Sequence, residues 1–336
     1  MRRAITVAIG LVVIGSVSIA AQWPKFRDAS VPRDAQGKVL MDAPPPRTAD
    51  GKIDFTGIWM RAESGPPRQG RGGRQGGGAG AAAPAAPAPA APAGRQAGPG
   101  GVPGGDTGAA FAGGRGGVSL EPATERFPYD PSGPPVATFF EAGGNMEGGL
   151  PYTPWAREVR RQRFEVNKAK DNPDAMCMPM GFLQFHQQPQ PRKIIQTKQL
   201  VLIEYEANYG LRKIYIDGRP LPKQGDPQPW WYGYSVGRWE GDTLVVETNN
   251  LRGAEDGPYD GWLDVNGSPY SNQATFTERI RRPTFGHLQI DLTVNDPKGY
   301  TKPWTVRVDQ RITVDEEPIE FICNENQQFR QRIKID

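Results

Sequence analysis

Residues 200–326 form a succession of strand-length apolar segments, separated by turn residues and interrupted by no convincing helix. The clearest segment is 287–295, in which Leu288, Ile290, Leu292 and Val294 alternate with polar residues. Alternation with a period of two is typical of a β-strand with one buried face and one solvent-exposed face. This part of the chain therefore predicts an antiparallel β-meander.

The turn residues between these segments favour short connections. Turns are predicted at Asn208-Tyr209-Gly210, at Glu240-Gly241-Asp242, near Phe285-Gly286 and at Asp315-Glu316-Glu317-Pro318. The strand candidates are 54–59, 194–197, 200–206, 211–216, 231–239, 243–249, 274–282, 287–295, 304–314 and 319–324. Such a series favours a mainly β fold, an up-and-down (lipocalin-like) barrel or a strongly curved meander, because closure removes unpaired strand edges. A β-sandwich is the alternative.

A helix is predicted over residues 154–170. Pro154 suits the first turn, and Trp155, Val159 and Val166 fall on one face at helical spacing. Asn172-Pro173 would end the helix. We expect this apolar face to pack against the β-domain, with the arginines and lysines of the other face in solvent.

The N-terminal region predicts export. Residues 1–21 combine Arg2 and Arg3, an apolar run over 4–17, and the small residues Ala20 and Ala21 at the expected cleavage point, as in a secretory signal peptide. Residues 22–61 then form an N-terminal segment with the first strand. Residues 62–118 are rich in Gly, Ala, Pro and Arg and predict a disordered linker, and 119–336 carry the helix and the meander. The expected location is periplasmic or secreted.

The charge balance offers little attraction for polyanions. The chain has 40 basic and 37 acidic residues and a net charge of +3, so no nucleic-acid partner is expected. After signal cleavage no stable membrane insertion is expected either, and the sequence leaves the oligomeric state open. The two cysteines, Cys177 and Cys323, would enter an oxidising compartment, which favours a disulfide over two buried thiols.

Three stretches resemble a family of uncharacterised secreted bacterial proteins. They are Pro46–Lys52 with Gly57-Ile58-Trp59, the run GYSVGRWEGDTLVV over 233–246, and Cys323-Asn324-Glu325-Asn326. This resemblance implies export and one β-rich domain, and it implies no catalytic residue. Gly57-Ile58-Trp59 ahead of a meander also resembles the Gly-x-Trp signature of lipocalin-like (calycin) barrels.

Several carboxylates and arginines are candidates for catalysis. Glu204 and Glu206 are expected on the same face of a strand, with Arg212 on the next strand. Two close carboxylates can divide acid and base roles, as hydrolases and lyases require. Glu278 and Arg279 are a second candidate pair, of which only one can face a barrel interior. Charged outer faces joined by cross-strand ion pairs are the alternative interpretation of both pairs.

Aromatic residues are concentrated between 226 and 270. Aromatic faces beside polar groups suit a sugar or another amphipathic ring. The candidate ligand-binding residues are Trp230, Trp231, Trp262, Asp264 and Tyr270. Asp256, Asp260, Asp264 and Asn266 could also cluster as oxygen ligands for calcium, but their spacing fits no EF-hand, so neither a metal nor another cofactor is predicted.

The sequence thus favours an exported barrel-like protein that binds a small amphipathic or carbohydrate-like ligand. It assigns no chemistry to that protein, because no nucleophile and base occur in a recognisable motif. A carboxylate-dependent hydrolase or lyase and a structural envelope protein are the two alternatives.

Overall fold

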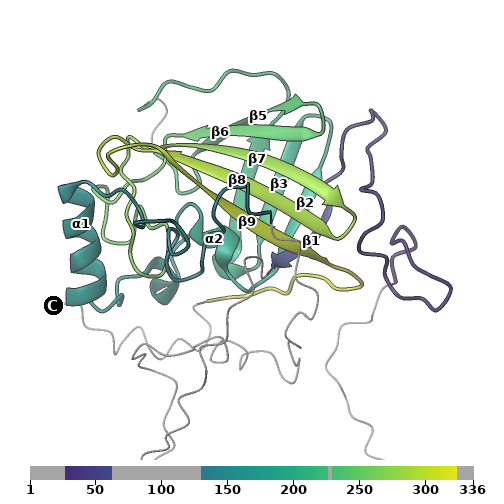
Figure 1. Ribbon diagram of the computed structural model, residues 1–336, viewed down its shortest axis with the longest axis horizontal. Helices are drawn as coiled ribbons and strands as arrows, with labels where there is room; N and C mark the ends of the chain where they lie inside the picture. The colour runs from purple at the N-terminus through teal and green to yellow at the C-terminus, as the bar shows by residue number, and fades with distance from the viewer. Residues whose placement is uncertain (1–26, 63–129, 226–228, 324–336) are drawn as a thin grey trace, which may run out of the picture.

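The structure, a computed structural model, describes residues 27–62, 130–225 and 229–323. Within these residues nine strands form a closed barrel, in which β9 pairs back with β1 (Figure 1). The mainly β, barrel-type fold is therefore confirmed. The signal peptide over 1–21, residues 63–118 of the linker and the motif residues 324–326 lie outside the described residues. The strands are β1 (Gly57–Arg61), β2 (Arg192–Gln196), β3 (Leu200–Tyr205), β4 (Gly210–Tyr215), β5 (Tyr234–Glu240), β6 (Thr243–Asn249), β7 (Thr275–Thr284), β8 (His287–Asn295) and β9 (Trp304–Thr313).

All neighbouring strands are antiparallel except β4 and β5, which run parallel. Nine is an odd number, so strict alternation of direction cannot close the ring, and one parallel pair is a geometric necessity. The parallel contact is short, with Ile214 opposite Ser235 and Tyr215 opposite Val236. The chain between β4 and β5 must return along the barrel, which explains the long connection over 216–233.

Every predicted strand except 319–324 has a counterpart in the structure, although 54–56 and 231–233 lie outside the strands that form there. β6 and β8 have the predicted bounds, whereas no strand forms in the described part of 319–324. Instead, the backbone N–H of Ile319 donates to the Glu206 carboxylate at 3.0 Å. The barrel is closed by β1, which pairs with both β2 and β9. β1 precedes the long linker in sequence, and it thus completes the sheet that is formed by strands after the linker.

The N-terminal segment also contacts the turn between β5 and β6. The guanidinium of Arg47 donates two hydrogen bonds to Asp242, at 2.9 and 2.7 Å. The ring of Phe55 stacks on Trp239 with centroids 5.5 Å apart. The sequence stretches 46–52 and 233–246 therefore meet in space.

Trp59 and Arg282 join β1 to the end of β7. The Trp59 ring is fully buried, and its Nε1 donates to the Phe55 carbonyl at 2.9 Å. The Arg282 guanidinium lies 4.8 Å from the Trp59 ring centroid and donates to the Phe285 carbonyl at 2.7 Å. This stacked pair anchors β1, the strand that carries Gly57-Ile58-Trp59, to the sheet.

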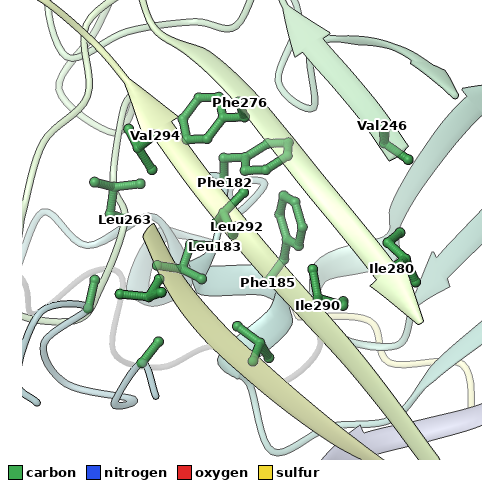
Figure 2. Close-up of a cluster of buried hydrophobic side chains, with 14 of the residues drawn as sticks. Phe182, Leu183, Phe185, Val246, Leu263, Phe276, Ile280, Ile290, Leu292 and Val294 are labelled. Carbon is green, nitrogen blue, oxygen red and sulfur yellow. The ribbon is translucent and has the colours of Figure 1, made fainter. Parts of the chain in front are cut away.

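The barrel interior is occupied by the chain itself. The segment around α2 (Gln184–Gln187) places Phe182, Leu183 and Phe185 among inward-facing residues of β7 and β8 (Figure 2). The Phe182 ring stacks on Phe276 at 4.2 Å. At Gly181 the backbone passes so close to Trp262 that a Cβ would lie 1.8 Å from the Trp262 carbonyl oxygen, so only glycine fits. We call residues 178–190 the plug segment.

The predicted helix forms, but its C-terminal part differs from the prediction. α1 (Pro154–Arg161) continues as a π-helix, η2 (Gln162–Val166), and the chain then leaves helical geometry well before residue 170. Ala156 is the buried residue of α1, and Arg163 is the buried residue of η2. The prediction that Val166 packs inward was wrong, because the π-helical turn rotates this side chain towards solvent, where it is 52 % exposed. Two short 3-10 turns, η3 (Pro173–Met176) and η4 (Ala207–Tyr209), are the other helical elements of the described residues besides α2.

The predicted Cys177–Cys323 disulfide is present, with Cα atoms 5.4 Å apart. It links the chain just ahead of the plug segment to the end of the described C-terminal segment. Among the described residues, no helix has the length and apolar character that crossing a membrane requires.

Candidate functional site

A charged cluster lies inside the barrel, centred on Glu278 of β7 and Arg212 of β4. Both side chains are almost completely buried. Arg212 donates one hydrogen bond to Glu278 Oε1 at 3.0 Å and a second, shorter one to Oε2. Such a bidentate contact between guanidinium and carboxylate is the strongest geometry available to this pair. It brings together two of the residues that the sequence analysis named as catalytic candidates.

His186 of the plug segment completes the cluster. Its Nε2 lies 3.0 Å from Glu278 Oε1, and its ring is buried. Burial lowers the pKa of His186 to about 4, although the neighbouring Glu278 partly opposes this. Burial alone would raise the pKa of Glu278, but Arg212 and His186 outweigh it and hold that pKa at about 2. At neutral pH the cluster therefore contains an ionised carboxylate, a guanidinium and a neutral imidazole that donates from Nε2.

Arg212 also contacts hydroxyl groups of the barrel wall. Its guanidinium donates to Ser235 Oγ on β5 and to Thr248 Oγ1 on β6, each at 3.1 Å. The Phe182 ring lies 4.7 Å from the guanidinium carbon. The cluster therefore ties β4, β5, β6, β7 and the plug segment together, and both oxygens of its carboxylate are engaged by protein groups.

The other catalytic candidates lie apart from this cluster. Glu204 is exposed on the outside of β3, and Arg279 is paired at the surface with Glu240 at 2.9 Å. Glu206 follows the end of β3 and binds the Ile319 N–H, so it does not share a strand face with Glu204 as predicted. The reason is that the chain turns into η4 at this point and breaks the alternation. Glu204 and Glu206 therefore do not form an acid–base pair beside Arg212.

Three of the five predicted ligand-binding residues are buried and packed against other protein groups. Trp262 is fully buried beneath the Arg163 guanidinium, which lies 4.4 Å from the ring centroid. Asp264 accepts hydrogen bonds from the backbone of Ala142 at 2.8 Å and from the Ser268 hydroxyl at 2.6 Å. The Tyr270 hydroxyl accepts from the Phe182 backbone at 3.3 Å. These side chains shape the loops around the plug segment and present no ligand-facing surface.

The other two, Trp230 and Trp231, are accessible to solvent, and Trp230 contacts one of two stacked tyrosines. Tyr215 ends β4 and Tyr234 begins β5, and their rings stack with centroids 5.3 Å apart. Trp230 is 42 % exposed and packs edge-on against Tyr234 at 5.6 Å. Trp231 is partly exposed, with the Arg252 guanidinium 4.7 Å from its ring. We call Tyr215, Trp230, Trp231 and Tyr234 the aromatic surface.

The parallel pairing of β4 and β5 creates this surface. Ile214 and Ser235 point into the barrel as a registered pair, so the adjoining Tyr215 and Tyr234 point outwards. Gly233 makes the entry to β5 with φ of 65°, and a Cβ there would lie 2.6 Å from the Asn249 carbonyl oxygen. The turn therefore requires glycine, and it fixes Trp230 and Trp231 beside the start of the strand.

Polar groups lie at the edge of the aromatic surface. The Arg219 guanidinium covers the Tyr215 ring at 3.7 Å and donates to the Tyr234 hydroxyl at 3.1 Å. Asp217 pairs with Arg219 at 2.7 Å, and hydrogen bonds from this arginine lower the pKa of Asp217. Both charges are therefore compensated locally, and the edge presents hydrogen-bonding groups without a net charge.

The oxygen-rich loop over 256–266 does not resemble a calcium site. Asp256 accepts from the Gly253 N–H at 2.8 Å, and Asp260 accepts from Arg252 at 2.9 Å. Asp264 is occupied by Ala142 and Ser268. Within the described residues, no group of three or more metal-ligating side chains could hold a metal ion.

Several participants in these sites were not among the predicted site residues, namely His186, Tyr215, Tyr234, Asp217 and Arg219. His186 lies in a segment without periodicity, and a single histidine in such a segment carries no signal of its own. Tyr215 could have been found, because it adjoins the inward-facing position 214 at the end of a predicted strand. No family model, curated protein or solved structure matches this chain.

Proposed function

We propose that this protein is an exported barrel protein that binds a small carbohydrate-like ring at the aromatic surface. The observation that carries this proposal is the exposed Trp230 ring, held edge-on against the stacked pair of Tyr234 and Tyr215. A rigid aromatic surface loses little conformational entropy when a ring stacks on it.

The polar edge of the surface supports a ligand with hydroxyl groups. A sugar has an apolar face of C–H groups and a rim of hydroxyls, which match an aromatic face bordered by hydrogen-bonding side chains. Asp217, Arg219 and the Tyr234 hydroxyl supply both acceptors and donors at this rim. Because Arg219 and Asp217 neutralise one another, the surface favours a neutral ligand over a strongly anionic one.

The interior cluster supports a binding role more than the hydrolase or lyase alternative. Glu278 is bonded through both oxygens to Arg212 and His186, and all three side chains are buried. A general acid or base needs to reach the proton that it transfers. The remaining candidate carboxylates, Glu204 and Glu206, lie apart from Arg212.

A thermal-shift screen of neutral sugars, lipids and aromatic acids tests the proposal. We expect stabilisation by a neutral sugar and loss of that stabilisation in Trp230→Ala. Phe140→Ala is the control, because Phe140 is similarly exposed at 39 % and is distant in sequence from the aromatic surface. Stabilisation by no sugar would favour the structural-protein alternative. Equal stabilisation of both variants would place the ligand elsewhere.

A further inference from the structure

Two consecutive asparagines, Asn249 and Asn250, lie at the end of β6, and both are buried. Because β6 pairs with β5, Asn249 is the registered partner of Tyr234 of the aromatic surface. Asn250 has a φ of 56°, a left-handed conformation that asparagine tolerates better than most residues. The chain therefore changes direction beside the start of β5.

The amide side chains of both asparagines hold the connection between β4 and β5. Asn249 Nδ2 donates to the Pro222 carbonyl at 2.6 Å. Asn250 Nδ2 donates to the Lys223 carbonyl at 3.0 Å, and Asn250 Oδ1 accepts from the Gly225 N–H at 2.6 Å. The described part of this connection forms neither a strand nor a helix. Side-chain hydrogen bonds therefore take the place of a backbone ladder here.

The backbone of Asn250 holds the other end of the same connection. Its carbonyl accepts from the Trp230 N–H at 2.8 Å, and the Trp230 carbonyl accepts from the Arg252 N–H at 3.0 Å. These two bonds form the parallel bridge between Trp230 and Leu251. Asn250 thus binds one end of the connection through its side chain and the other end through its backbone.

The two asparagines are therefore bonded to the backbone positions that carry the aromatic surface. Trp230 is held by the Asn250 carbonyl, and its ring packs edge-on against Tyr234, the partner of Asn249. A binding surface that is ordered before the ligand arrives loses less conformational entropy on binding than a mobile one. Loss of the asparagine contacts should therefore weaken binding without removing any group that touches the ligand.

We infer that Asn249 and Asn250 are positioning residues for the aromatic surface and that they raise its affinity for a neutral sugar. The effect on affinity rests on the function proposed above, whereas the positioning role rests on the hydrogen bonds alone. Neither asparagine needs to contact the sugar, because both are buried and bonded to the protein.

Asn250→Gly tests the positioning role. Glycine adopts the left-handed conformation of Asn250 readily, so the substitution removes the amide contacts and leaves the backbone geometry accessible. Hydrogen exchange of peptides that cover residues 229–234, followed by mass spectrometry, measures the order of this part of the surface. We expect exchange roughly tenfold faster than in wild type, because two side-chain hydrogen bonds to the connection are lost.

Asn208→Gly is the matched control. Asn208 has a φ of 55°, and its Nδ2 donates to Asp174 Oδ1 at 3.1 Å and to the Met178 carbonyl at 3.2 Å. The two variants should have similar midpoints of urea unfolding, but only Asn250→Gly should exchange faster over 229–234. Unchanged exchange in Asn250→Gly would overturn the inference, as would an equal increase in the control.

Titration calorimetry with cellobiose, a neutral disaccharide, tests the effect on affinity. Asn250→Gly should bind cellobiose roughly three- to tenfold more weakly than wild type, because the surface must be ordered on binding. Asn208→Gly should retain the wild-type affinity. Faster exchange with unchanged affinity would overturn the link between position and binding. A wild type that does not bind cellobiose would count against the proposed function, and the exchange experiment would still decide the positioning role.

Discussion

The guanidinium of Arg212 and the carboxylate of Glu278 form a buried ion pair across the barrel interior, between strands β4 and β7. The pair closes the space between distant strands, and it holds the plug segment through the contact of His186 with Glu278. A buried ion pair need not add stability by itself, but the loss of one partner leaves an uncompensated charge.

Glu278→Gln should therefore destabilise the protein by about 3–5 kcal/mol. Urea unfolding measures this loss. Glu240→Gln is the matched control, because Glu240 pairs with Arg279 at the surface and should contribute less than about 1 kcal/mol. Replacement of both partners, as Arg212→Met with Glu278→Leu, should recover much of the loss. A single variant as stable as the control would contradict the buried pair.

Acidification should destabilise the protein first through His186. Its pKa falls from 6.5 in the unfolded chain to about 4 in the folded one, so between these values the unfolded chain binds the extra proton. Stability is fully present above about pH 6.5 and decreases towards pH 4, by roughly 3 kcal/mol. The lowered pKa of Glu278 adds a second loss, between about pH 4.5 and 2.

The comparison of wild type with His186→Gln isolates the first of these losses. Urea unfolding at a series of pH values should give a flatter profile between pH 6.5 and 4 for the variant. Because glutamine can still donate to Glu278, the fold should survive the substitution. Identical profiles for the two proteins would mean that His186 does not titrate with the folding equilibrium.

The disulfide should contribute several kcal/mol. It joins residues 146 apart in sequence, and cross-linking a long loop restricts the unfolded chain. Cys177→Ser with Cys323→Ser should lower the free energy of unfolding by about 2–5 kcal/mol. The denatured, unreduced wild type should show no titratable thiol. Two titratable thiols would contradict the pairing.

The buried and the exposed tryptophans of the predicted aromatic site should differ in their effects on stability. Trp262→Ala should destabilise the protein by about 3–5 kcal/mol, because it removes a fully buried ring. Trp230→Ala should cost clearly less free energy of unfolding, about 1 kcal/mol, since this residue is 42 % exposed in the folded protein. Urea unfolding of both variants makes the comparison. Similar losses in both would contradict the assignment of one ring to the interior and the other to the surface.

The sequence predicted best where one physical rule acts alone. Alternation along β8 gave its bounds, and the opposite faces of Glu278 and Arg279 followed from the same period of two. The turn glycines at 210 and 241 marked two strand connections correctly. Local patterns could be used there because pairing with neighbouring strands imposes the same pattern.

The candidate site depended on contacts that no local pattern encodes. Trp262 and Trp230 have similar surroundings in the sequence, yet Arg163 from a distant helical turn covers only the first. His186 enters the barrel because Gly181 lets the chain pass close to Trp262, a contact between segments far apart in sequence. The exposure of Val166 follows from a π-helical turn, which regular helical spacing does not predict.

The most direct test of the central claim is a saturation-transfer difference NMR experiment with a neutral sugar identified in the thermal-shift screen. The account predicts transfer from the protein to the C–H face of the sugar, loss of that transfer in Trp230→Ala, and full retention in Phe140→Ala. Undiminished transfer in Trp230→Ala would contradict the claim that the aromatic surface of Tyr215, Trp230, Trp231 and Tyr234 binds the ligand.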